Sequence, residues 1–374
     1  PRHAVEPDGS ASATMTAMDA ATVGIYSGQT ERWVERRRAL DVDAARALRA
    51  ATPRGRVADL GCGPGFHLDA LGPGTIALDA AEPMVRRAVG LGGIGAVGDL
   101  EALPFRDGAL DGAWASRSYV HVARARLPLA LRELHRALAA DSPISITMIP
   151  GDHDGPDLPD DDFPGRWFGL WSEPELRDVV TGAGFDAVTI DEMIGGRPGG
   201  GRLLVTARRA RRLPDVVGPG LRLLVCGLNP SEYSADAGVA YARPGNRFWP
   251  AALRAGIVTR DRDPLAALAD HGVGFTDLVA RATPAISDLA KGEFAAGVAR
   301  VERLVARTGA RVVCFVGLAG YREAVDRRAV AGVQDRAFGD AITYVMPSTS
   351  GLNASSQVPD LAEHLAAAAA LAAT

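Results

Sequence analysis

Short apolar runs alternate with helical patterns through the first half of the chain. The runs are rich in small or β-branched residues and lie at 56–60, 75–79, 112–116, 144–149, 187–190 and 202–206. Helical spacing of apolar residues separates them, most clearly at 127–139 and 173–184. Strands that alternate with helices are typical of a parallel α/β sheet. A loop at 150–164, rich in Pro, Asp and Gly, interrupts this rhythm and is too polar to be packed.

The same alternation begins again after a basic, proline-punctuated stretch at 207–219. The pattern predicts strands at 222–226, 312–316 and 342–346, and helices at 247–255, 293–308 and the alanine-rich 359–373. Residues 1–22 are small and polar without an apolar period, which is typical of a disordered leader. We therefore expect a leader at 1–22, an α/β domain at 23–207, a linker at 208–219 and a second α/β domain at 220–374.

Composition fits two globular domains. Of the 374 residues, 47% are hydrophobic and 23% are charged, which is enough for a core in each domain. No run is long and apolar enough for a bilayer helix and no signal pattern is present, so we expect a cytoplasmic protein without a membrane partner. Cys62, Cys226 and Cys314 have neither zinc-binding nor disulfide-framework spacing, so we expect reduced core thiols and no metal.

The charge is distributed unevenly. The formal net charge is −4, but from Asp215 onward 16 basic residues balance 16 acidic ones. Neutralisation of phosphates usually supplies much of the affinity for DNA. A second domain that binds DNA must therefore gather its arginines on one face.

A glycine-rich turn follows the first predicted strand. The run V-A-D-L-G-C-G-P-G at 57–65 places three alternate glycines before a helical pattern, and such a turn lets a ligand approach bare backbone. Asp79 ends the next strand, where a carboxylate can accept hydrogen bonds from both ribose hydroxyls of a nucleoside. A third acidic turn, Gly98-Asp99-Leu100, follows.

These three sites, in this order and spacing, resemble class I S-adenosylmethionine-dependent methyltransferases over residues 26–207. The resemblance implies a Rossmann-like fold and S-adenosylmethionine as cofactor. It implies that Asp79 binds the ribose, and that Asp99 and Leu100 face the adenine. The residues that would face the amino-acid part of the cofactor are Asp59, Gly61, Gly63 and Gly65.

The methyl acceptor stays open. The chain has no Asn-Pro-Pro-Tyr or paired-cysteine signature, which leaves small molecules, RNA, protein or no activity at all. Tyr119 and His121 lie where an acceptor could be contacted, although a single histidine there is more often ordinary packing. Three aromatic residues fit an acceptor wall and a core equally well: Trp167, Phe168 and Trp171.

The second domain opens with a strand that runs into Gly227-Leu228-Asn229-Pro230. This places Asn229 at the carboxyl end of a strand, where open α/β sheets bind their ligands. Cleavage of an N-glycosidic bond needs a positioned water and stabilisation of charge. An amide can hold the water, but it has no negative charge, so it should act more slowly than an aspartate.

Two further motifs make the pattern specific. Residues 241–249 read Y-A-R-P-G-N-R-F-W and residues 346–353 read M-P-S-T-S-G-L-N. With Gly-Leu-Asn-Pro, they resemble the mismatch-specific uracil/thymine-DNA glycosylase family over the whole second half, which implies a uracil-DNA glycosylase-like α/β/α fold. The resemblance implies that Asn229 places the attacking water and that Tyr241 stacks on an extruded base.

The resemblance also assigns DNA contacts. It implies an intercalation loop, Ser350-Gly351-Leu352, in which Leu352 is the apolar wedge. Backbone donors near Ser348 would bind phosphates. Ser231 stands where the family usually has glycine, which leaves rate and base preference open. Ser234 is a second position near the base.

The implied function is monofunctional removal of uracil, with thymine as a second candidate base, opposite guanine in double-stranded DNA. No cofactor is expected for this step, and Lys291 lies outside every motif, so no Schiff-base nucleophile is evident. One alternative makes the first domain a methyltransferase of RNA or a small molecule, with the second as a nucleic-acid-binding module. In another, the first domain is a scaffold or sensor.

Overall fold

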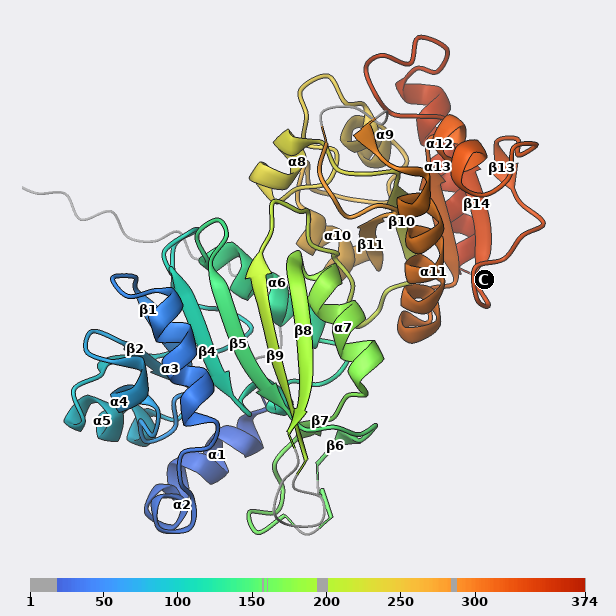
Figure 1. Cartoon of the computed structure of the whole chain (residues 1–374). Coiled ribbons are helices and arrows are strands. Elements are labelled where there is room, and N and C mark those ends of the chain that lie inside the picture. The colour runs from blue at the N-terminus through green and yellow to red at the C-terminus, as the bar shows by residue number, and fades with distance from the viewer. Residues whose placement is uncertain (1–18, 157, 160, 194–200, 284–287, 374) are drawn as a thin grey trace, which may run out of the picture.

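The computed structural model describes residues 19–156, 158–159, 161–193, 201–283 and 288–373, so most of the predicted leader lies outside the described residues. The chain forms two α/β units, each built on its own sheet (Figure 1). No helix among the described residues is long and apolar enough to cross a membrane. The three cysteines are buried free thiols, as predicted.

The first unit contains a seven-stranded sheet in the order β3-β2-β1-β4-β5-β9-β8. Strands β3, β2, β1, β4 and β5 are parallel, and β9 is antiparallel to both of its neighbours. The strands are β1 (Val57–Leu60), β2 (Ile76–Asp79), β3 (Ile94–Val97), β4 (Gly112–Ser116), β5 (Pro143–Met148), β8 (Phe185–Met193) and β9 (Arg202–Arg209). The strand order reverses between β1 and β4, and this reversal opens a crevice at the carboxyl ends of the strands.

Helices pack against this sheet (Figure 1). The helices are α1 (Ala20–Gly28), α2 (Thr30–Arg36), α3 (Val42–Ala51), α4 (Leu68–Leu71), α5 (Glu82–Gly90), α6 (Leu127–Ala137) and α7 (Glu173–Gly182). Between β5 and α7 the chain forms a small hairpin of β6 (Asp154–Gly155) and β7 (Phe168–Gly169). The loop predicted at 150–164 is therefore partly ordered by strand pairing.

The second unit has a five-stranded sheet in the order β11-β10-β12-β14-β13. Four strands are parallel and only β13 is antiparallel. The strands are β10 (Leu223–Gly227), β11 (Val273–Asp277), β12 (Val312–Val316), β13 (Gly332–Val333) and β14 (Ile342–Met346). Strands β10 and β12 are buried along their whole length, as expected of parallel strands covered on both faces.

The helices of the second unit are α8 (Glu232–Ala237), α9 (Phe248–Arg254), α10 (Pro264–His271), α11 (Lys291–Thr308), α12 (Leu318–Ala324) and α13 (Val358–Ala373). One continuous apolar core joins β10, β12 and β14 to α9, α11 and α13. Because the parallel strands all end at the same edge, the residues that follow β10, β11 and β14 come together there.

Several elements differ from the sequence prediction. Helix α1 begins at Ala20, inside the predicted leader, because Asp19 caps it by accepting from Thr22 N at 2.8 Å. Strand β9 continues to Arg209, two residues into the predicted linker. Strand β11 was missed because Gly274 interrupts its apolar run; the carbonyl of Val216 approaches so closely that only glycine fits.

The two units touch through ordered polar contacts. Asp215 N donates to Gly182 O at 2.8 Å, and Arg303 on α11 pairs with Asp178 on α7, which lies beside α11 in Figure 1. Arg132 on α6 donates to Gly238 O at 3.2 Å. These contacts join the first unit to the second directly, in addition to the covalent connection.

Candidate functional site

The glycine turn after β1 is shaped by its neighbours. Gly61 and Gly63 have φ values of +71° and +53°, which favour glycine. A Cβ at Gly61 would clash with the side chain of Ser118. Gly65 has φ +93°, and a Cβ there would press on Leu68 and Ala88, so this third glycine serves the packing of α5.

Asp79 ends β2 beside this turn. Its carboxylate accepts from Gly63 N at 2.8 Å and from Ala81 N at 2.9 Å. Burial raises the pKa of Asp79, and these backbone donors oppose that shift. The carboxylate is thus fixed by the backbone, with Asp79 lining the cavity.

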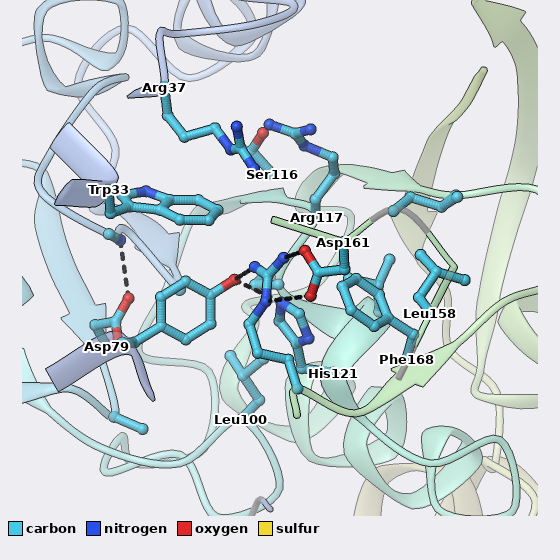
Figure 2. Close-up of a pocket in the computed structure, with 18 of the residues that line it drawn as sticks. Trp33, Arg37, Asp79, Leu100, Ser116, Arg117, His121, Leu158, Asp161 and Phe168 are labelled. Atoms are coloured by element: carbon cyan, nitrogen blue, oxygen red, sulfur yellow. Dashed lines mark hydrogen bonds and ion pairs between the residues drawn. The ribbon is translucent and has the colours of Figure 1, made fainter. Parts of the chain in front are cut away.

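A cavity of about 340 Å³ opens at the crevice between β1 and β4 (Figure 2). Gly61, Gly63, Asp79 and Leu100 line it, so these four predicted cofactor residues lie together. These features fit three parts of S-adenosylmethionine. The bare glycine turn fits the amino-acid part, the fixed carboxylate of Asp79 fits the ribose, and the apolar Leu100 fits the adenine.

Asp59 and Asp99, which were also predicted to face the cofactor, do not line the cavity. Asp59 is 1% exposed, and burial, followed by the charge of Asp79, raises its pKa to about 8. Asp59 therefore stays mostly protonated at neutral pH. Asp99 accepts from Glu101 N at 2.9 Å and shapes the turn that carries Leu100.

A polar network closes the far side of the cavity. Tyr26 on α1 donates to His121 Nε2 at 2.8 Å, and Arg166 donates to the Tyr26 oxygen at 2.6 Å. His121 Nδ1 lies 2.7 Å from Trp167 O, a pure acceptor, so Nδ1 carries the proton and Nε2 accepts. Burial, and next the charge of Arg166, lowers the pKa of His121 to about 3. His121 is therefore neutral.

Arg117 is the unpaired cation of the cavity. Its backbone is left-handed, with φ +53°, and its N–H donates to Thr147 O at 3.1 Å. The guanidinium makes no hydrogen bond or ion pair within the described part of the chain, whereas the nearby Arg37 and Arg166 pair with Asp162 and Asp161. Burial lowers the pKa of Arg117. The arrangement suits a ligand with a negative group.

The residues considered as contacts for a methyl acceptor lie in different places, since some line the cavity and others are buried in the core of the first unit. Phe168 lines the cavity, and so does His121. Tyr119 and Trp171 are completely buried in the core cluster of the first sheet. Trp167 contributes its carbonyl to His121 and directs its ring N–H to Asp154 at 3.1 Å.

In the second unit, Asn229 follows β10 at the carboxyl edge of the sheet. Its Nδ2 donates to Thr283 Oγ1 at 2.7 Å and lies 3.3 Å from Pro230 O and 3.4 Å from Arg281 O. Because two of these three oxygens are carbonyls, the amide nitrogen must face them. The side-chain carbonyl Oδ1 is turned the other way, and it accepts from none of the described residues.

Tyr241 lies beside the end of β10. Its ring stacks on Phe248, with centroids 4.3 Å apart and an interplanar angle of 20°, so one face is covered by protein. Its hydroxyl is buried and has no hydrogen-bond partner among the described residues. A Cβ at Gly227 would lie 3.2 Å from that hydroxyl, which shows how close the ring comes to the strand end.

Asp277 is a group that the sequence argument missed. It ends β11 directly opposite Gly227, and a Cβ at Gly227 would clash with its Oδ1. Burial raises the pKa of Asp277 to about 7, the charge of Asp215 adds to the shift, and Arg300 opposes it. Its position at a strand end was the available signal, but β11 itself was not predicted.

The two serines after Asn229 are engaged within the protein. Ser231 caps α8: its Oγ accepts from Ser234 N and donates to Ser234 Oγ, both at 3.2 Å. Its φ of −70° is an ordinary value, so the position does not require glycine. Ser234 is 4% exposed and accepts from Ala242 N at 3.3 Å, which joins α8 to the Tyr241 segment.

The loop after β14 presents Leu352. This side chain is 93% exposed, the most exposed large apolar residue among those described. Ser350 N donates to Ser348 Oγ at 3.2 Å, and Leu352 N donates to Ser350 Oγ at 3.3 Å. Gly351 packs on Gly245 O, where a Cβ would come within 2.9 Å. The loop is therefore a compact turn with an apolar tip.

Comparison with known families matches both units. Residues 214–371 match the model of the uracil DNA glycosylase superfamily, and residues 58–146 match that of a methyltransferase domain. The chain joins a methyltransferase domain to a uracil DNA glycosylase superfamily domain. The predicted α/β fold, Rossmann-like in the first unit and glycosylase-like in the second, is confirmed.

Solved structures resemble the methyltransferase part. A S-adenosylmethionine-dependent methyltransferase of Thermotoga maritima, described as a possible histamine N-methyltransferase, is 19% identical, with 50% of this chain and 99% of that chain covered and a TM-score of 0.39. The 1,6-didemethyltoxoflavin-N1-methyltransferase of Burkholderia thailandensis, solved with 1,6-didemethyltoxoflavin and S-adenosylhomocysteine, is 21% identical, with 54% and 93% covered and a TM-score of 0.41.

Proposed function

We propose that the glycosylase domain removes uracil, with thymine as a second base, from opposite guanine in double-stranded DNA by monofunctional hydrolysis of the N-glycosidic bond. The observation that carries the proposal is Asn229, whose Nδ2 is held by Thr283 while Oδ1 accepts from none of the described residues at the edge where Tyr241 lies. A fixed amide oxygen of this kind positions a water without ionising it.

The neighbours of Asn229 suit an extruded base. Phe248 covers one face of the Tyr241 ring, and we assign the other face to stacking on the base. Leu352, on its compact loop, would fill the gap that the base leaves in the duplex. The reacting sugar becomes positively charged, and an ionised Asp277 carboxylate near the site would stabilise that charge.

The chain also supports hydrolysis without strand cleavage. Lys291, at the start of α11, is its single lysine and lies outside the motifs that meet at the carboxyl edge. Cleavage of the strand by a glycosylase usually needs an amine that attacks the sugar. The expected product is therefore an intact strand with an abasic site.

A labelled U:G duplex tests this proposal. Wild-type protein should leave the strand whole until alkali is added, and the alkali should then cut it at the former uracil. Asn229→Ala should lower the rate by about 100-fold or more, the range for loss of a positioned group that acts on the attacking water. Asp79→Asn, in the other domain, is the control and should release base at the wild-type rate. Absence of alkali-dependent cleavage by wild type contradicts the proposal.

We further propose that the methyltransferase domain binds S-adenosylmethionine and methylates a small molecule. The supporting observation is the cavity, which is bordered by Trp33 on α2 as well as by Tyr26 and Arg166. A cavity lined in this way, with a volume of about 340 Å³, suits a small acceptor better than a polynucleotide, which needs an extended basic groove. The unpaired Arg117 favours an acceptor or a cofactor group with negative charge.

The cofactor supplies the methyl group, and the chain supplies its position. Asp79 would accept from the ribose hydroxyls, and the bare turn at Gly61 and Gly63 would admit the amino-acid part. Tyr26 and His121 join α1 to the segment after β4 at the border of the cavity. Transfer of radioactive methyl from the cofactor to a cell extract should label the small-molecule fraction. Label in RNA would instead favour the alternative in which the second domain only binds nucleic acid.

A further inference from the structure

One arginine joins the two most distant motifs of the glycosylase domain. Arg247 precedes α9, and its guanidinium lies against the loop after β14, more than 100 residues further along the chain. Nη2 donates to Ser350 O at 2.6 Å and also to Asn353 O, while Nη1 donates to Ser356 O. The backbone N–H of Arg247 donates to Thr349 O at 2.9 Å.

Arg247 therefore binds both ends of the segment that carries Leu352. The segment has hydrogen bonds of its own, including Asn353 Nδ2 to Ser348 O at 2.8 Å and Asn353 N to Ser350 O at 2.9 Å. Those bonds are local, since they join residues at most five apart. The arginine bonds tie the loop to α9, which is part of the buried core.

We propose that Arg247 is a positioning residue that holds the segment 350–356 in the shape that presents Leu352 to DNA. The inference rests on the proposed glycosylase function. A wedge that is already ordered loses little conformational freedom when it enters the duplex. A wedge on a loose loop must lose that conformational freedom when the base is extruded. This loss of entropy lowers the rate of base release from paired DNA.

The chemistry of the contact requires arginine. A planar guanidinium can direct N–H groups to several carbonyls at once, whereas a lysine ammonium is a compact point charge on a flexible stem. Lysine at this position should therefore restore only part of the effect. Partial restoration by lysine would distinguish a guanidinium that hydrogen-bonds to the loop from a positive charge that only attracts phosphate.

Two substrates separate positioning from chemistry. Uracil in a single strand needs no displacement from a pair, whereas uracil opposite guanine in a duplex does. We expect Arg247→Met to lower kcat/KM on the U:G duplex by about 10- to 100-fold, the range for misplacement of a group outside the reaction centre. The loss on single-stranded uracil should stay within about threefold, and Arg247→Lys should lie between Arg247→Met and wild type.

A matched control comes from the same helix. Arg254 lies in the last turn of α9, is exposed, and makes no side-chain hydrogen bond or ion pair within the described part of the chain. Arg254→Met removes the same charge and should leave both substrates unchanged. Equal losses of Arg247→Met on the two substrates, or full activity of Arg247→Met on the duplex, would overturn the proposal.

Hydrogen exchange tests the loop without any catalysis. The amides of Leu352 and Asn353 should exchange at least tenfold faster in Arg247→Met than in wild type or Arg254→Met. Unchanged exchange would overturn the role of Arg247 even if the protein excises uracil. If wild type releases no base from either substrate, the proposed function fails, and the exchange result still decides whether Arg247 orders the loop. If Arg247→Met does not fold, Arg247→Lys gives the same comparison.

Discussion

The two sites of this chain are assembled in different ways. The cofactor cavity is built from consecutive turns: Gly61, Asp79 and Leu100 lie within 40 residues of one another and follow neighbouring strands. The glycosylase site that we propose combines Asn229, Tyr241 and Leu352, which span more than 120 residues, and Arg247 hydrogen-bonds to the loop that carries Leu352. The first site is a cavity lined by several elements, whereas the second ends in an exposed apolar tip.

Because the two sites share no residues, a substitution should disable one site without the other. The cavity lies at the carboxyl edge of the first sheet, and the Asn229 site lies at the carboxyl edge of the second. Substitutions in one domain that leave the fold intact should therefore not reach the chemistry of the other.

The largest loss is expected from a substitution that disables only the cofactor site of the first domain. Asp79→Ala removes the carboxylate that we propose accepts from the two ribose hydroxyls, and hydrogen bonds to a charged group contribute about 1.5–3 kcal/mol each. Calorimetry should show S-adenosylhomocysteine binding weakened by about 100-fold or more, while base release stays at the wild-type rate. Asp69→Ala, at an exposed position on α4, is the control and should bind normally. A parallel loss of base release would contradict separate sites.

A smaller effect concerns the stability of the first domain. Gly61→Ala places a Cβ on a residue with a left-handed backbone, at φ +71°, and that Cβ also clashes with Ser118. The left-handed conformation alone costs a residue with a Cβ about 1–2 kcal/mol. Gly74→Ala shares the left-handed backbone, at φ +78°, but has open space around it. The free energy of unfolding of the first domain should fall for both variants and fall further for Gly61→Ala. Equal losses would mean that the contact with Ser118 adds nothing.

The smallest expected effect is a pH dependence of the second site. Burial raises the pKa of Asp277 to about 7, so its carboxyl group is protonated below that pH and ionised above it. If the ionised form stabilises the sugar cation, base release should rise several-fold from pH 6 to pH 8. Asp277→Asn should flatten this rise without abolishing activity. An unchanged pH profile in Asp277→Asn would exclude Asp277 as its source.

The same group has an opposite effect on stability. Its folded pKa lies above the unfolded value of about 3.9, so folding favours the protonated form. Stability should therefore decline as the pH rises from about 4 to 7. Asp277→Asn should be less sensitive to pH over this range, as measured by thermal unfolding.

The features that could be predicted from the sequence are those that depend on residues adjacent in the chain. Strands β4, β12 and β14 have the predicted bounds, because each coincides with a short run of mainly apolar residues. The cavity lining contains Gly61, Gly63, Asp79 and Leu100, which belong to turns that directly follow strands. In each case, the residue and the strand that positions it are adjacent in the chain.

Contacts between distant segments could not be predicted in this way. Tyr26 meets His121 across 95 residues, and nothing near Tyr26 in the sequence indicates a partner. Asp277 depends on β11, whose apolar run is broken by Gly274. Arg247 was interpreted as part of a helix start, and its backbone does precede α9, but its side chain belongs to the Leu352 loop. Tertiary packing, rather than local propensity, determines these three roles.

Release of free uracil from a U:G duplex in single-turnover conditions tests the proposed glycosylase function directly. Wild type and Asn229→Ala should be compared in preparations with the same thermal unfolding profile, which establishes that both domains are folded in each protein. We expect one free uracil per duplex from wild type, with the strand still whole, and a rate lower by about 100-fold or more in Asn229→Ala. Equal rates for the two proteins, or no free uracil from wild type, would contradict the proposed function.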